Sequence, residues 1–133
     1  MPPVRSVAAC ALLLAATGCS PICRVLVRLL PPRGATLDPA KLTLNVDYVS
    51  SGTRSGTETP MRMTPDGDAV ETETTIRASS ARVSVRAWLD QNGSGTRDSG
   101  DLEGASGPFT VVDRGLIRGN DNRLPDLLLT KLP

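Results

Sequence analysis

The residues with the clearest capacity for chemistry lie between positions 90 and 101, in the stretch DQNGSGTRDSGD. Oxygen-bearing residues recur at alternate positions from the first aspartate, and Gly95 stands at the sixth position, where a metal-binding loop turns sharply. Calcium takes about six to eight hard oxygen ligands, and a short loop surrounds the ion only if alternate residues point inward. The spacing therefore predicts a calcium site with these candidate ligands: Asp90, Asn92, Ser94, Thr96, Asp98 and Asp101.

The chemistry of the individual positions predicts a weak site. Thr96 would offer its backbone carbonyl, and Asp98 could bind directly or through water. Ser94 is a weaker ligand than Asp or Asn, Asp101 is shorter than the usual Glu, and Glu103 could supplement the set. We expect a structural site with a Kd on the order of 10⁻⁴ to 10⁻³ M, as in extracellular modules. The alternative is a solvated loop rich in ordinary turn-forming residues.

The flanks of this loop are predicted to be strands. In RVSVRAWL, Val83, Val85, Ala87 and Leu89 alternate with polar residues, which places them on the buried face and Trp88 on the outer face near the loop. The residues GASGPF after the loop lead toward another strand. Two strand flanks argue against the helix–loop–helix sensor that opens when calcium binds.

The rest of the chain repeats the two-residue alternation, and no extended helical period is visible. The tripeptide PDG at 65–67 predicts a tight hairpin, PPRGATLDP at 31–39 a long connection, and 50–57 a flexible loop. Further strands are predicted at 24–30, 41–49, 69–78, 109–113 and 126–132. This pattern predicts an all-β protein, a single small antiparallel β-sandwich of about seven strands.

The order of strand, AWLDQNGSGTRDSGD and strand resembles a family of bacterial surface domains, the B-type repeats of serine–aspartate-repeat proteins. The resemblance implies a prealbumin-like or immunoglobulin-like sandwich over residues 23–133. It also implies that the loop at 90–101 binds calcium through the candidate ligands above and ties the strand ends together. It identifies no partner.

The beginning of the chain predicts export. Residues 1–18 combine Arg5 with an apolar run that is too short to span a bilayer, which is typical of a signal peptide. The residues AATGC resemble the lipobox of bacterial lipoproteins, which implies acylation of Cys19 and a short tether at 19–22. Ser20 after the cysteine resembles lipoproteins sent to the outer membrane. The alternative is an ordinary signal cut nearby that leaves Cys19 as a plain thiol.

Composition removes several classes of chemistry. The chain has no histidine, which excludes histidine-dependent triads and histidine-ligated zinc. Loss of Arg5 with the signal peptide leaves as many basic as acidic side chains, so the net charge does not indicate a nucleic-acid partner. Cys23 would be the one remaining free thiol, expected as a small buried residue at the start of the first strand, with a reactive or intermolecular role as the alternative.

These features predict a non-enzymatic lipoprotein of the bacterial cell envelope, anchored in the membrane by its lipid. Its partner would be an unidentified envelope protein or a polysaccharide, and an adhesin or carbohydrate-binding module is the alternative. A carboxylate-based hydrolase is a weaker alternative, because Glu71 and Glu73 share a strand face with Arg77 and are expected to be solvated. The polar stretch 118–123 could lend an oxygen to the calcium loop or form a plain turn.

Overall fold

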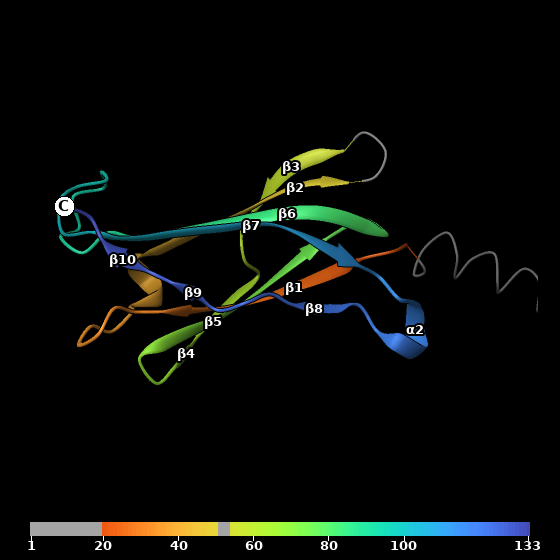
Figure 1. Ribbon diagram of the computed structural model, residues 1–133, viewed down its shortest axis with the longest axis horizontal. Coiled ribbons are helices and arrows are strands. Elements are labelled where there is room, and N and C mark those ends of the chain that lie inside the picture. Colours follow the sequence, from red (N-terminus) through yellow and green to blue (C-terminus); the bar gives the residue numbers. More distant parts are fainter. Residues whose placement is uncertain (1–19, 51–53) are drawn as a thin grey trace, which may run out of the picture.

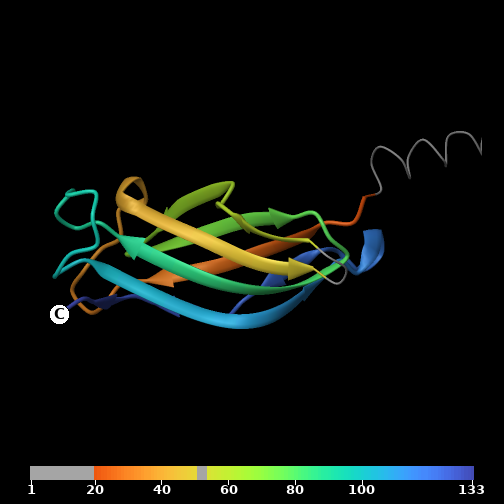
Figure 2. The same cartoon turned by 90° about the horizontal axis from the view of Figure 1, so that it is seen from above.

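The computed structural model describes residues 20–50 and 54–133, which form two β-sheets packed face to face (Figures 1 and 2). The predicted all-β sandwich is confirmed. The predicted signal peptide at 1–18 and the candidate lipidation site Cys19 lie outside the described residues. No helix in the described ranges is long and apolar enough to cross a membrane.

The first sheet is built around β1 and has the order β4-β5-β1-β8, with β9 also paired to β1. β1 runs antiparallel to β5 and parallel to both β8 and β9. The members of this sheet are β1 (Cys23–Leu30), β4 (Arg62–Asp66), β5 (Ala69–Ile76), β8 (Asp121–Arg123) and β9 (Leu127–Leu128).

The second sheet has the order β10-β7-β6-β2-β3, and every pairing in it is antiparallel. Its members are β2 (Leu42–Ser50), β3 (Ser55–Glu58), β6 (Ser80–Leu89), β7 (Leu102–Val112) and β10 (Thr130–Lys131). Two short helical turns, η1 (Pro39–Lys41) and α2 (Gly115–Arg118), lie outside the sheets.

The core between the sheets consists almost entirely of Val and Leu, as the alternation predicted. Every second residue of β1 is buried, and β6 buries its predicted inward set completely. The outward residues of β6 stay exposed or half-buried, Trp88 among them. Cys23 is buried at the start of β1, and its thiol donates to the carbonyl of Ala78 at 3.2 Å. The expected structural placement of this cysteine is therefore confirmed.

The described residues contain ten strands, more than the number expected, because several short polar strands carry little alternation. The predicted flexible loop at 50–57 is wrong in part, since residues 55–58 form β3 against β2. The predicted strand at 109–113 is the end of the longer β7, which starts directly after the loop. The predicted turn at 118–123 is also wrong in part, because residues 121–123 form β8.

The predicted strand at 126–132 divides between the two sheets. Residues 127–128 pair with β1, and residues 130–131 pair with β7. Leu129, fully buried, lies at the crossover and closes one edge of the core. Gly104 of β7 makes this approach possible, because a Cβ there would lie 2.9 Å from Leu129 Cδ2 and 3.0 Å from the carbonyl oxygen of Leu128.

Candidate metal centre

The predicted calcium loop connects β6 to β7 at the end of the sandwich opposite α2 (Figures 1 and 2). Leu89 and Leu102 are direct partners in the ladder, so the loop leaves and re-enters the sheet at one pair of residues. The backbone N–H of Asp90 donates to the carbonyl of Lys41 at 3.2 Å, which fixes the start of the loop beside η1. Both ends of the loop are therefore positioned by regular structure.

Hydrogen bonds bring four of the predicted ligands into direct contact. Ser94 Oγ donates to the carbonyl oxygen of Thr96 at 3.0 Å and also contacts a carboxylate oxygen of Asp98. Asn92 Nδ2 donates to the same carboxylate oxygen of Asp98 at 3.1 Å, and Thr96 Oγ1 donates to the other at 3.0 Å. The side chains of Asn92, Ser94 and Asp98 and the carbonyl of Thr96 thus converge on one region of the loop.

The carboxylate of Asp90 shapes the turn at which this convergence occurs. It accepts hydrogen bonds from the backbone N–H groups of Ser94 at 3.2 Å and Gly95 at 2.7 Å. Gly95 has a φ of 79°, in the left-handed region that favours glycine. Asp90 is therefore a neighbour of the convergent group and holds the backbone that carries it.

Asp101 has a role that the sequence did not predict. Its side chain is completely buried, and three N–H groups donate to its two oxygens. Gln91 N donates to Oδ1 at 3.0 Å, while Trp88 Nε1 and Asp98 N donate to Oδ2 at 3.0 and 2.8 Å. The sequence offered one signal for this role of Asp101, which was the outward Trp88 beside the loop. An indole N–H that is taken out of water needs an acceptor. Through these bonds Asp101, the last residue of the loop, is joined to the first turn of the loop and to β6.

These hydrogen bonds stabilise the ionised forms of two loop carboxylates. The hydroxyl of Ser94, with smaller contributions from Asn92 and Thr96, lowers the pKa of Asp98 below its ordinary value. The backbone N–H of Asp98, followed by Trp88 and Gln91, lowers the pKa of Asp101, although burial opposes the shift. Both carboxylates are therefore negatively charged near neutral pH.

The donor set fits calcium in its chemistry, because every candidate ligand is a hard oxygen. The fit is incomplete in geometry: within residues 20–50 and 54–133 no three acidic or cysteine side chains form a metal-binding group. Asp101 is the candidate ligand with the fewest free acceptor positions, because its two oxygens already accept three N–H groups. Asn92, Ser94, Thr96, Asp98 and Asp90 are the residues that could hold the ion.

Glu103 and Asp121, which lie outside the loop, pair with arginines. Glu103, a possible supplementary ligand, instead forms an ion pair with Arg97 on the outer face of the second sheet, with Arg97 Nε 2.6 Å from Glu103 Oε2. Asp121, in the second polar stretch, pairs with Arg24 at 2.8 Å.

The second polar stretch lies at the α2 end of the sandwich, far from the calcium loop, so it lends no oxygen to the site (Figure 1). Its buried residue, Asn122, joins the two sheets instead. Asn122 Nδ2 donates to the carbonyls of Arg24 in β1 and Val112 in β7 at 3.3 and 2.9 Å, and its Oδ1 accepts from Val112 N at 3.0 Å.

Comparisons with known proteins provide no family assignment. The chain matched none of the protein-family models, and neither the curated proteins nor the solved structures gave a significant match.

Proposed function

We propose that the chain is an exported, non-enzymatic lipoprotein of the bacterial envelope, anchored through acylated Cys19, whose sandwich is stabilised by calcium in the loop at 90–101. Its role would be binding or assembly at the envelope, with a protein or a polysaccharide as partner. The observation that carries the calcium part is the convergence of Asn92, Ser94, Thr96 and Asp98.

The convergent groups form one hydrogen-bonded cluster whose members are also calcium ligands by chemistry. Each group that donates to the Asp98 carboxylate also carries an oxygen that can face a cation: the Asn92 amide and the Ser94 and Thr96 hydroxyls. A bound calcium would supply positive charge to the carboxylates of Asp90 and Asp98 and hold the loop in one conformation.

A cation bound in this loop would serve to stabilise the fold. The chain has one Trp, one Tyr and one Phe, so the core depends on small aliphatic side chains. Each fully buried Val or Leu contributes only about 1.5–3 kcal/mol, and ordering each residue costs a similar amount. A cation that binds the folded loop and not the unfolded chain adds stability by mass action.

The carboxylates outside the loop support a non-catalytic role. Glu71 and Glu73 of β5 lie on the outer face of the first sheet. Their partners there are arginines of β1, and not Arg77, which shares their strand face in the sequence pattern. Arg24 pairs with Glu73, and Arg28 Nε lies 3.8 Å from Glu71. These ion pairs give both carboxylates a structural role on the outer face of the first sheet.

Thermal unfolding of the mature chain with calcium or chelator tests the calcium proposal. Calcium at about ten times Kd stabilises a one-site protein by about 1.4 kcal/mol, which raises the Tm of a domain of this size by roughly 5 °C. Asp98→Asn, which is close to aspartate in size and removes its charge, should remove this rise, and so should Asp90→Ala. Asp126→Asn, an exposed residue outside the loop, should keep it. Identical melting curves with calcium and with chelator would contradict the proposal.

The anchor needs a separate measurement. Cells supplied with an alkyne-labelled fatty acid should label the chain, and Cys19→Ala should abolish the label and release the protein from membranes. Cys23→Ala serves as the matched control, since that buried thiol contacts Ala78 and should not be acylated. A labelled Cys19→Ala variant would contradict acylation at this cysteine.

A polysaccharide partner is favoured by one feature. A shallow hollow beside the loop, on the outer face of the second sheet, is lined in part by Trp88, Arg97, Glu103 and Thr43. A half-buried indole with charged neighbours suits the apolar face and hydroxyls of a sugar. Cell-wall fragments that bind there should change Trp88 fluorescence, and crosslinking in cells should capture polysaccharide. Capture of a defined envelope complex with unchanged Trp88 emission would favour the protein partner.

A further inference from the structure

Two large apolar side chains are completely exposed on the α2 turn. Leu116 and Ile117 have relative accessibilities of 101% and 100%, the highest of the exposed large hydrophobic residues among those described. Neither helical propensity nor packing explains them, because a four-residue helix with no buried residue contributes nothing to the core. Two adjacent apolar residues at the tip of a loop indicate a surface that contacts another apolar phase.

The described chain begins at this same end of the sandwich (Figures 1 and 2). Ser20 and Ile22 line one shallow hollow together with Asp113 and Leu116, and Ile22 N donates to Asp113 Oδ2 at 3.0 Å. The first described residues are thus held against the segment that carries Leu116. Cys19 directly precedes Ser20 in the sequence, and one residue spans only about 3.8 Å.

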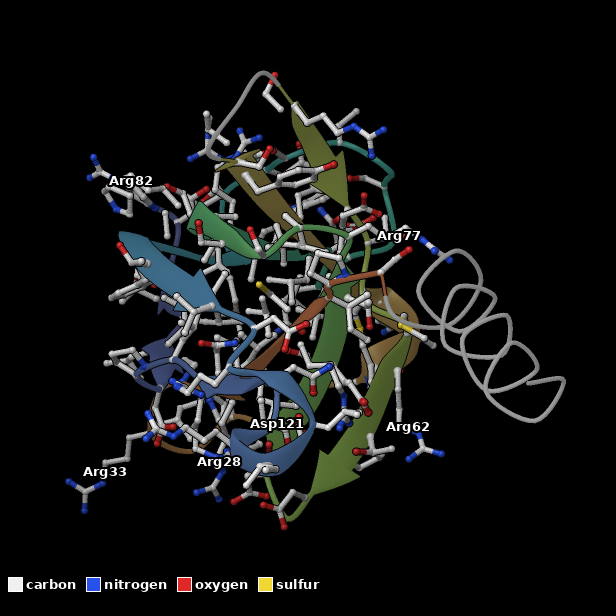
Figure 3. The ribbon with its side chains drawn as sticks, turned by 90° about the vertical axis from the view of Figure 1, so that its right-hand side faces the viewer. Arg28, Arg33, Arg62, Arg77, Arg82 and Asp121 are labelled. Carbon is white, nitrogen blue, oxygen red and sulfur yellow. The ribbon has the colours of Figure 1, made fainter. Side chains whose placement is uncertain are left out.

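Exposed arginines share this end of the sandwich with the apolar pair. Five arginines lie at this end, and no carboxylate of the described ranges is within ion-pair distance of any of them: Arg54, Arg77, Arg82, Arg114 and Arg118. Viewed onto this end, Arg77 and Arg82 project outward on either side of the sandwich (Figure 3).

The acidic residues near α2 are already engaged. Asp113 accepts from the backbone N–H groups of Ile22 and Gly115, and Asp121 pairs with Arg24. Arg24 thus offsets the charge of Asp121, while Asp113 keeps its charge. The five exposed arginines outnumber these two carboxylates, and Arg114 Nη1 donates only to the backbone carbonyl of Asp121, at 3.3 Å. The net charge of this end of the sandwich favours an anionic partner.

We propose that the segment Arg114–Gly119 is a membrane-docking tip, in which Leu116 and Ile117 enter the interfacial region of the bilayer and Arg114 and Arg118 bind lipid phosphates. The inference rests on the proposed anchor at Cys19, because the anchor brings this end of the domain to the lipid. The occupant is a bilayer containing anionic lipids. An apolar pair flanked by arginines matches such a surface in both its acyl region and its headgroups.

Docking has a geometric consequence for the domain. A single flexible attachment would allow the sandwich to rotate about the tether, whereas attachment at Cys19 and at α2 restricts that rotation. The long axis of the sandwich would then stand away from the membrane, with the calcium loop at the far end (Figure 1).

The test uses the acylated chain reconstituted into vesicles that contain phosphatidylglycerol and bromine-labelled phosphatidylcholine. Leu116→Trp introduces a fluorophore at the tip, and Leu128→Trp introduces the same change at an exposed position, 55% accessible, along the sheet. The emission of Trp88 is subtracted with the unsubstituted chain. We expect the bromolipid to quench Leu116→Trp and leave Leu128→Trp unquenched.

Further variants test the lipid contacts. Ile117→Ser in the Leu116→Trp chain should reduce the quenching, and Arg114→Gln with Arg118→Gln should reduce it in anionic vesicles more than in zwitterionic ones. Each arginine near an anionic surface changes partitioning by roughly fivefold. Equal quenching of the two tryptophan variants would overturn the inference. Protection of Leu116→Trp from aqueous acrylamide without bromolipid quenching would also overturn it, because a protein would then cover the tip.

The same preparation separates failure of the tip from failure of the anchor. Mass spectrometry of the N-terminal peptide reports acylation of Cys19. An acylated chain without quenching at position 116 refutes the docking tip alone, whereas an unmodified Cys19 refutes the anchor on which it rests.

Discussion

Asn122 provides the most direct test of how the two sheets are held together. Its side chain is 7% accessible and bonds to β1 on one side and β7 on the other, so it is a polar crosslink inside an otherwise aliphatic sandwich. Asn122→Ala would remove these bonds and leave the N–H and carbonyl of Val112 without their partner. The perturbation therefore acts on both sheets at once.

The magnitude follows from the individual bonds. The amide has two protons, shared among the carbonyls of Arg24, Val112 and Asn120, so it donates about two full hydrogen bonds; with the bond that Val112 N donates to Oδ1, about three are lost. At about 1 kcal/mol for each bond, with some further cost for stranded groups, Asn122→Ala should lower the free energy of unfolding by about 2–4 kcal/mol. For a domain of this size, the Tm should fall by roughly 8–16 °C.

Urea denaturation followed by Trp88 fluorescence measures this loss. Trp88 lies near the loop, at the end of the sandwich opposite Asn122, so a shift of its whole transition reports global unfolding. Asn120→Ala is the matched control, because only the backbone of Asn120 accepts a hydrogen bond from Asn122.

A second variant separates hydrogen bonding from packing. Asn122→Asp has the same shape and keeps the acceptor for Val112 N, but it turns a carboxylate oxygen toward three carbonyls, so it should be at least as destabilised as Asn122→Ala at pH 7. If Asn122→Asp were as stable as the unsubstituted chain, or if Asn122→Ala and Asn120→Ala lost equal stability, the crosslink would carry no energy and the reasoning would fail.

Three further predictions concern the crossover, the loop and the buried thiol. Gly104→Ala should destabilise the chain by about 1–3 kcal/mol in urea, since its methyl would overlap the strand that changes sheets; an unchanged midpoint would show that this strand can move aside. Asp98 and Asp101 have lowered pKa values in the folded chain, so the stability they contribute is present at neutral pH and is lost as pH falls below about 4; Trp88 fluorescence in an acid titration should show this loss, and Asp101→Asn should weaken its pH dependence. Burial raises the pKa of the Cys23 thiol, so iodoacetamide at pH 8 should modify it only when urea unfolds the chain, as peptide mapping would reveal.

The sequence predicted β1, β2, β5 and β6 well because their alternation records burial directly. β6 has the predicted inward residues, β2 lies over the predicted range 41–49, and the loop at 90–101 connects two paired strands as expected. These features depend on neighbours in sequence, so a local pattern is sufficient to predict them. Cys23 belongs to the same group, since its burial follows from its place in the alternation of β1.

The features that escaped prediction depend on contacts between distant segments. β8 and β9 are short and gain their strand geometry from β1, and the crossover near Leu129 requires Gly104 on another strand. Asn122 resembles a turn residue in sequence because asparagine is common in turns. The burial of Asp101 depends on Trp88, which supplies one of its three donors. No spacing rule contains these pairings.

The position of β1 also determines when the sandwich can form. β1 lies inside the first sheet, with β5 beside it on one side and β8 and β9 on the other. The Arg24–Asp121 contact joins residues 97 positions apart. A chain that leaves the ribosome or a translocation channel from its N-terminus presents β1 long before β8 and β9 are available. Such high contact order slows folding, because the entropy of closing a long loop must be lost before the pairing stabilises it. A chain of this topology completes its core only after nearly all of its residues have emerged.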